Sequence, residues 1–290
     1  MALVPSDRLE RGDLVFDVYD EGPVGADVFV LLHGWPADAS CWAEVSRHLV
    51  RRGHRVVALD QRGYSPGARP SGRRAYRMSE LVADVLALLD RLGSAPIHLV
   101  GHDWGGAVAW AVASSHPERL ATVSVLSTPH PRALARSLAS SPQVLRSGYV
   151  AFFQLPVVPE ALLLAGGGAV ARRVLERSGL DSERAATYVR RMREPGALSA
   201  SLAWYRAIPL DLGPGAGEIT VPALYVWSTG DSALGRRAAE LTADHVSGPY
   251  RFEVLEGVSH WIPEEVPDTV AELLDDHAGR ARRPLRPGSP

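Results

Sequence analysis

Runs rich in apolar residues alternate with segments of helical periodicity through the first half of the chain. Such runs, typical of strands buried on both faces, lie at residues 28–32, 55–59, 97–100 and 121–126. The helical segments between them lie at residues 40–52, 79–92 and 107–115. An alternating stretch at residues 14–19 predicts an antiparallel edge strand. This order predicts right-handed βαβ units and a mostly parallel central sheet flanked by helices, an α/β fold.

The alternation of strand and helix patterns ends after residue 130, where helical patterns follow one another without a convincing strand. The predicted helices lie at residues 133–149, 160–175, 182–191 and 198–206, and strand patterns return at 223–227 and 250–255. We therefore expect a core made of residues 1–130 and 218–279, with an inserted helical cap at 131–217. Residues 280–290 carry four arginines and three prolines with little apolar content, which predicts a disordered tail.

Composition narrows the classes of function. The 290 residues are 46% hydrophobic with a net charge of −2, which gives no reason to expect nucleic acid or an anionic membrane as a partner. The chain has no lysine, so Schiff-base and P-loop lysine chemistry are excluded. The single cysteine, Cys41, leaves no intrachain disulfide, and the histidines show no metal-ligand spacing, so we expect no metal. Without a signal peptide or an apolar run of bilayer length, a cytoplasmic location is expected.

The main candidate for a catalytic residue lies in a turn between a predicted strand and a predicted helix. It spans residues 101–105 and reads Gly-His-Asp-Trp-Gly, the nucleophile-elbow pattern with Asp103 where most such enzymes carry serine. Glycines on both sides fit a tight bend in which a Cβ would collide with neighbouring backbone. Taken alone, the same segment is also explained as a structural turn capped by Asp103.

Three motifs together resemble the α/β-hydrolase fold and, within it, the epoxide hydrolase family, which shares an aspartate elbow with haloalkane dehalogenases. They are the elbow at Asp103, the His-Gly-Trp-Pro segment at residues 33–36, and Trp204-Tyr205-Arg206 in the predicted cap. The resemblance covers about residues 14–277. It implies an α/β-hydrolase fold with an inserted helical cap, no cofactor, and a small-molecule epoxide as substrate.

The resemblance assigns the reaction to three side chains. Asp103 would attack an epoxide carbon and form an alkyl ester, which splits a difficult hydrolysis into two easier steps. His260, just after the last predicted strand, would activate the water that cleaves the ester. Asp231, directly after the strand at residues 223–227, would orient His260 and stabilise its cation. The order nucleophile, acid, histidine along the chain is the one this fold uses.

Further site residues follow from the same resemblance. The backbone N–H groups of Trp35 and Trp104 would form an oxyanion hole for the charge that develops when water attacks the ester. Tyr205 and Tyr149 would donate hydrogen bonds to the epoxide oxygen, because an alkoxide is a poor leaving group. Substrate-binding side chains are expected at His33, Trp104, Trp204, Phe153 and Trp261.

Two other functions remain open. A haloalkane dehalogenase would use the same three residues but needs two N–H donors for the departing halide, of which Trp104 could be one. The second donor is commonly an asparagine after the His-Gly pair, and this chain contains no asparagine, which leaves Trp204 as a candidate. A non-catalytic ligand-binding protein of the same fold is the second alternative. For the oligomeric state, a homodimer is an open alternative.

Overall fold

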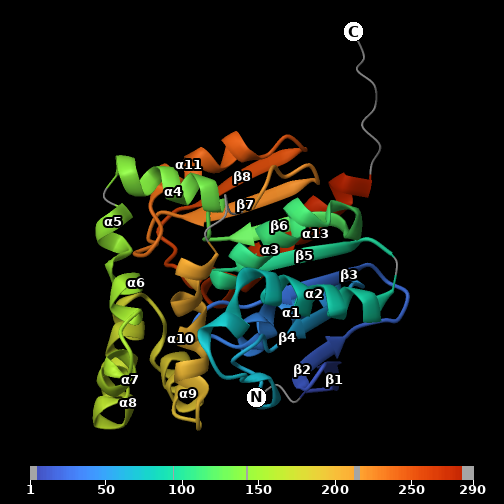
Figure 1. Ribbon diagram of the computed structural model, residues 1–290. Helices are drawn as coiled ribbons and strands as arrows, with labels where there is room; N and C mark the ends of the chain where they lie inside the picture. The colour runs from blue at the N-terminus through green and yellow to red at the C-terminus, as the bar shows by residue number, and fades with distance from the viewer. Residues whose placement is uncertain (1–4, 94, 142, 212–215, 283–290) are drawn as a thin grey trace.

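A computed structural model describes residues 5–93, 95–141, 143–211 and 216–282 around an eight-stranded sheet (Figure 1). The strand order is β1-β2-β4-β3-β5-β6-β7-β8. The strands are β1 (Asp7–Arg11), β2 (Leu14–Glu21), β3 (Val28–Leu32), β4 (Arg55–Leu59), β5 (Ile97–His102), β6 (Leu120–Leu126), β7 (Ala223–Ser228) and β8 (Tyr250–Leu255). The pairs β1–β2 and β2–β4 are antiparallel, and every other neighbouring pair is parallel. The predicted mostly parallel sheet is confirmed, with an extra edge strand, β1, that the apolar pattern did not indicate.

Successive residues of the central strands pack against helices on opposite faces of the sheet. The covering helices are α1 (Ala43–Arg51), α2 (Met78–Leu92), α3 (Trp104–Ser115) and α13 (Pro267–Arg282). Val30 and Leu32 join an apolar cluster with α2 and α3, whereas Phe29 and Leu31 join a second cluster with α1 and α13. Because both faces are covered, a site built on this sheet has to open at the carboxyl ends of the parallel strands.

Seven helices connect β6 to β7, and the described residues between these strands contain no named strand. The helices are α4 (Pro131–Ser140), α5 (Gln143–Arg146), α6 (Gly148–Phe153), α7 (Val158–Leu163), α8 (Ala165–Arg177), α9 (Ser182–Met192) and α10 (Ala197–Ala207). The sequence pattern predicted fewer and longer helices here. One reason for the difference is the glycine run at residues 166–168, whose φ angles of 58°, 71° and 93° are left-handed and interrupt the helical path.

Short elements complete the fold. They are α11 (Arg236–Leu241), α12 (Ile262–Glu265) and the 3₁₀ turns η1 (Ala39–Trp42), η2 (Pro66–Ala68), η3 (Arg73–Tyr76), η4 (Pro117–Arg119), η5 (Ile208–Leu210) and η6 (Thr242–His245). Helix α13 continues to Arg282, so the prediction of disorder from residue 280 is wrong for residues 280–282, where Arg280 pairs with Asp276 one turn earlier. The rest of the predicted tail, residues 283–290, lies outside the described residues. Among the helices described, none is long and apolar enough to cross a bilayer.

Polar contacts tie two of the inserted helices to the carboxyl-end side of the sheet. Arg191 on α9 donates from Nε to Asp38 at 2.9 Å and from Nη2 to Asp60, just after β4, at 2.7 Å. Trp204 on α10 donates from Nε1 to the backbone oxygen of Arg62 at 2.8 Å. These bonds hold α9 and α10 beside the loop that follows β4.

The loop that follows β4 depends on a buried ion pair. Arg62 donates from Nε and Nη2 to the two carboxylate oxygens of Asp84 on α2, each at 2.7 Å, and both side chains are 3% exposed. We predict that Asp84→Ala lowers the free energy of unfolding by about 3–5 kcal/mol, because it leaves a buried guanidinium without its bidentate partner. Urea denaturation followed by circular dichroism measures this change.

Asp90→Ala, on the same helix, is the matched control. Asp90 pairs with Arg119 at 2.6 Å, but its side chain is 69% exposed. Exposed pairs contribute little, so we expect a change below about 1 kcal/mol. Equal losses of stability in the two variants would contradict the importance given to the buried pair.

Candidate active site

The elbow lies at the carboxyl end of β5, at the centre of the sheet. β5 ends at His102 and α3 begins at Trp104, so Asp103 alone makes the turn, with φ 50° and ψ −122°. A positive φ is rare for a residue with a Cβ and is typical of strained functional positions. A Cβ on Gly101 would lie 2.2 Å from the oxygen of Gly105, and one on Gly105 would lie 2.2 Å from the oxygen of Leu32. The two glycines are therefore required for the turn to close.

Two backbone N–H groups and a histidine surround the Asp103 carboxylate. Trp35 N donates to Oδ1 at 2.7 Å, and the N–H of Trp104 also bonds to the carboxylate. Gly34 lets the chain approach this closely, because a Cβ there would lie 2.3 Å from the Asp103 Cβ. Burial alone would raise the pKa of Asp103, but His260 and the Trp104 N–H hold it below its usual value. The carboxylate is therefore ionised at neutral pH.

His260 links the two aspartates. Its Nδ1 lies 2.8 Å from Asp231 Oδ2, and its Nε2 lies 3.7 Å from Asp103 Oδ2. Asp231, directly after β7, also accepts the backbone N–H groups of Ala233 at 2.8 Å and Leu234 at 2.9 Å. Burial would lower the pKa of His260, but the charges and hydrogen bonds of Asp231 and Asp103 raise it well above its usual value. The three side chains, far apart in sequence, thus form one hydrogen-bonded and charge-coupled group.

His102 fixes the backbone of this group. Its Nε2 lies 2.9 Å from the backbone oxygen of His260, and burial lowers its pKa to about 4. The neutral ring therefore donates to that oxygen. The only sequence signal for this role is its position beside Asp103, which does not indicate the contact with residue 260.

Two tyrosines from the inserted helices face Asp103 across a cavity. Tyr205 on α10 and Tyr149 on α6 have ring centroids 5.9 Å apart, and both line the cavity that contains Asp103 and His260. Burial raises the pKa of each hydroxyl above its usual value. Both hydroxyls are therefore protonated and able to donate a hydrogen bond.

The cavity has a volume of about 330 Å³ and walls that are largely apolar. Of the predicted substrate-binding residues, Phe153 and Trp261 line it, and Trp35 lines it as well. Sequence reasoning missed the lining residues from α6 to α8 and from the loop after Asp231, which are Phe152, Leu162, Leu163, Val170, Val174, Leu175, Ser178, Ser232 and Ala233. The apolar helical pattern of those on α6 to α8 does not distinguish a cavity wall from an ordinary packing surface.

The prediction that His33 binds substrate is wrong, because its side chain is buried away from the cavity. Its Nδ1 lies 3.0 Å from the oxygen of Gly34, and its Nε2 accepts the N–H of Gln61 at 3.1 Å. The burial that lowers the pKa of His33 to about 4 keeps the ring neutral. His33 instead joins the turn at residues 33–36 to the loop after β4.

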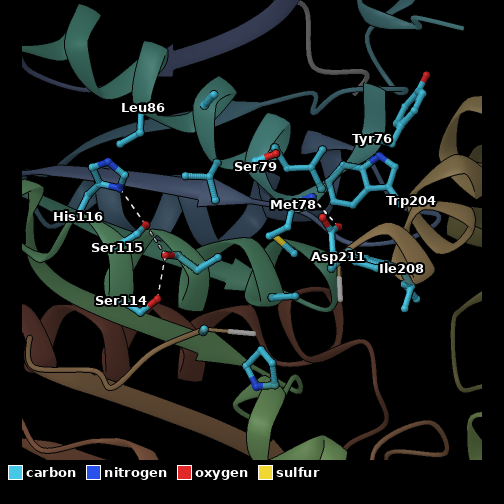
Figure 2. A pocket seen from close by; sticks show the side chains of 18 residues that line it. Tyr76, Met78, Ser79, Leu86, Ser114, Ser115, His116, Trp204, Ile208 and Asp211 are labelled. Carbon is cyan, nitrogen blue, oxygen red and sulfur yellow. Dashed lines mark hydrogen bonds between the residues drawn. The ribbon is translucent and has the colours of Figure 1, made fainter. Parts of the chain in front are cut away.

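The prediction that the indole rings of Trp204 and Trp104 bind substrate also needs correction. Both rings line a second, larger cavity of about 620 Å³ beside α2 and α3, and neither lines the cavity of Asp103; Figure 2 shows Trp204 in the wall of this second cavity. The Trp204 N–H is already donated to Arg62 O, so it is unavailable to a ligand in the first cavity. Trp104 reaches Asp103 through its backbone N–H.

Within the described ranges, the histidine, cysteine and acidic side chains form no group of three that could hold a metal ion.

Comparisons with known proteins agree with this geometry. The α/β-hydrolase fold family model matches residues 27–267. The AB hydrolase superfamily protein YfhM of Bacillus subtilis is 36% identical, with 88% of this chain and 90% of the relative covered. Epoxide hydrolase A of Mycobacterium tuberculosis is 30% identical over 93% of this chain and 96% of the relative. The crystal structure of epoxide hydrolase A from Mycobacterium thermoresistibile is 29% identical, with a TM-score of 0.80 and coverage of 93% of this chain and 97% of that one.

A family model that spans most of the chain, a relative aligned over nearly its whole length and a matching solved structure all agree with the aspartate elbow. The chain belongs to the α/β-hydrolase fold family and, within it, to the epoxide hydrolase family.

Proposed function

We propose that this protein hydrolyses epoxides to vicinal diols through an ester on Asp103. The observation that carries the proposal is the pair of protonated hydroxyls, on Tyr149 and Tyr205, that line the same apolar cavity as an ionised carboxylate. An epoxide needs both groups at once, a nucleophile for carbon and a proton donor for oxygen. The relatives named epoxide hydrolase support the same assignment.

The first step forms the ester. Asp103 Oδ1 is engaged by the Trp35 N–H, which leaves Oδ2 free to attack an epoxide carbon. The carbon–oxygen bond of the ring breaks, and the departing oxygen takes a proton from one of the tyrosine hydroxyls, which is later reprotonated from solvent. The apolar walls hold the carbon skeleton of the substrate and keep bulk water from the carboxylate.

The second step cleaves the ester. His260 takes a proton from water, and the resulting hydroxide attacks Cγ of Asp103. The negative charge that develops on Oδ1 is held by the N–H groups of Trp35 and Trp104. Collapse expels the diol oxygen, which takes the proton from His260. The carboxylic acid left on Asp103, which carries one oxygen from water, then gives its proton to the neutral His260 and returns to its carboxylate form.

The two steps need His260 in different protonation states. Before the ester forms, the charge of Asp103 helps to raise the pKa of His260, so the ring is a cation. Esterification removes that negative charge. The pKa of His260 then falls because its burial, which favours the neutral ring, is opposed by Asp231 alone. The base thus becomes available when water has to be activated.

The structure offers less support for the two alternatives. A dehalogenase needs a second N–H donor for the halide, but the indole N–H of Trp204 is donated to Arg62 O and that of Trp35 to Ser201 Oγ at 3.3 Å. A purely binding protein has no need of the charge-coupled Asp103, His260 and Asp231.

Isotope labelling tests the proposed ester. We predict that a single turnover of a small aryl epoxide in H₂¹⁸O places the label in the peptide that contains Asp103, because ester hydrolysis at Cγ leaves a water oxygen on the carboxylate. Mass spectrometry of the digested protein detects the label. The Asp103→Asn variant is the control, and we expect it to form no diol.

Label found only in the diol would mean direct attack of water on the epoxide and would overturn the mechanism. Halide release from a haloalkane, with no diol formed from the epoxide, would favour the dehalogenase. Ligand affinity that is unaffected by Asp103→Ala, with neither product formed, would favour the binding protein.

A second prediction concerns the proton donors. Tyr205→Phe keeps the ring that packs on Trp104 but removes the hydroxyl, so we expect kcat for ring opening to fall by about 10²-fold or more, the usual contribution of a positioned acid. Single-turnover kinetics with the same epoxide measures this step. Tyr250→Phe is the matched control, because the buried Tyr250 hydroxyl has no hydrogen-bond partner among the described residues. Equal rates in the two variants would remove Tyr205 from the mechanism.

A further inference from the structure

One segment of the inserted helices is almost free of charge. Residues 147–171 contain a single charged side chain, Glu160. That carboxylate accepts bonds from Arg206, with Oε1 2.7 Å from Nη1, and from Ser199 at 2.9 Å. The only charge of the segment is therefore neutralised by an ion pair within the protein.

The same segment exposes its apolar side chains. Of the eleven exposed large apolar side chains among the described residues, eight lie between residues 144 and 174. They are Val144, Leu145, Tyr149, Leu155, Val157, Val158, Leu162 and Val174, which we call the apolar rim. Helices α5 to α8, which carry six of the eight, run along one edge of the molecule, on the far side of α9 and α10 from the sheet (Figure 1). Exposed apolar side chains that are concentrated on one group of helices are typical of an interaction site.

Val157, between α6 and α7, is the most unusual member of the rim. It is 72% exposed, and its φ of 65° is left-handed, an outlier for a β-branched residue. A side chain that is costly both to expose and to hold in this conformation points to a function on the surface.

Basic side chains border the apolar rim. Arg172, Arg173 and Arg177 are exposed along α8, and Arg146 is exposed on α5. The one acid on that part of α8, Glu176, is paired with Arg172 at 2.8 Å. Arg173 and Arg177 therefore leave positive charge beside the apolar surface. Exposed aliphatic residues next to arginines match the boundary between lipid headgroups and acyl chains.

The apolar rim continues into the catalytic cavity. Leu162 and Val174 are each about half exposed, and both also line the cavity of Asp103. An apolar molecule that leaves a bilayer at the rim would thus reach the carboxylate along an apolar surface.

We propose that the apolar rim docks on the surface of an anionic lipid bilayer. The arginines of α8 select anionic headgroups, and the aliphatic side chains enter the boundary of the acyl chains. A second copy of this chain fits less well, because the rim carries no unpaired acid to meet these arginines; Glu160 and Glu176 are both paired. The net charge of −2 gave no reason to expect this partner, since it averages over faces of opposite sign. Delivery of apolar epoxides from the bilayer rests on the proposed function, whereas docking does not.

Flotation of the full chain with lipid vesicles tests the docking. We expect binding to vesicles of phosphatidylglycerol mixed with phosphatidylcholine, and little binding to phosphatidylcholine alone. Val157→Asp should weaken binding by at least about tenfold, because it puts a charge where an aliphatic group meets acyl chains. Arg173→Glu with Arg177→Glu should weaken it by at least about fivefold. Val24→Asp is the matched control, since Val24 is 91% exposed in the turn before β3, outside the rim.

Aspartate tolerates a positive φ better than valine does, so Val157→Asp is expected to fold. Its turnover of a water-soluble epoxide should match that of the unchanged chain, because Val157 does not line the cavity. Absence of vesicle binding, or equal loss in Val157→Asp and Val24→Asp, would overturn the docking proposal. A dimer seen by analytical ultracentrifugation and abolished by Val157→Asp would overturn it in favour of a second copy. Vesicle binding without diol formation would instead overturn the proposed function and leave the docking intact.

Discussion

The negative charge of one buried carboxylate, that of Asp103, determines how the rest of the site is built. A carboxylate that is taken out of water tends to become neutral, and a neutral acid is a weak nucleophile. Here the charge is kept by the N–H groups of Trp35 and Trp104 and by the cation of His260. These partners can approach because Gly34, and the glycines of the elbow, leave no Cβ in the way. The strained turn is therefore needed to bring Asp103 to the groups that keep its carboxylate charged.

The sheet and the inserted helices contribute different groups to the site. The carboxyl ends of β5 and β7 and the loop after β8 bring together Asp103, Asp231 and His260. The inserted helices bring the two tyrosine hydroxyls and most of the apolar wall. Contacts such as that of Arg191 with Asp60 hold the helices over the sheet, so the distance between carboxylate and hydroxyls depends on packing far from either group.

The features that sequence predicted well are those set by local pattern. Apolar runs predicted the central strands. Because the catalytic candidates each follow a strand, parallel pairing brings them to the same edge of the sheet. The direction of a single side chain depends on packing instead. Trp204 and Tyr205 are adjacent in sequence, but successive residues of a helix point about 100° apart, so only Tyr205 faces the carboxylate. His33 was misassigned for a similar reason, because its motif gives its place in the chain but not the buried partners of its ring.

The coupling of His260 to the charge of Asp103 is tested most directly by NMR titration of the histidine ring. We predict a pKa of His260 well above its usual value in the unchanged chain, a lower pKa in Asp103→Asn, and no change in the distant control Asp90→Asn. Because the folded pKa is raised, protonated His260 stabilises the fold fully below its unfolded pKa, and this contribution is lost as pH rises through the folded pKa. A pKa of His260 that stays the same in Asp103→Asn would contradict the coupling, and with it the mechanism by which esterification frees the base.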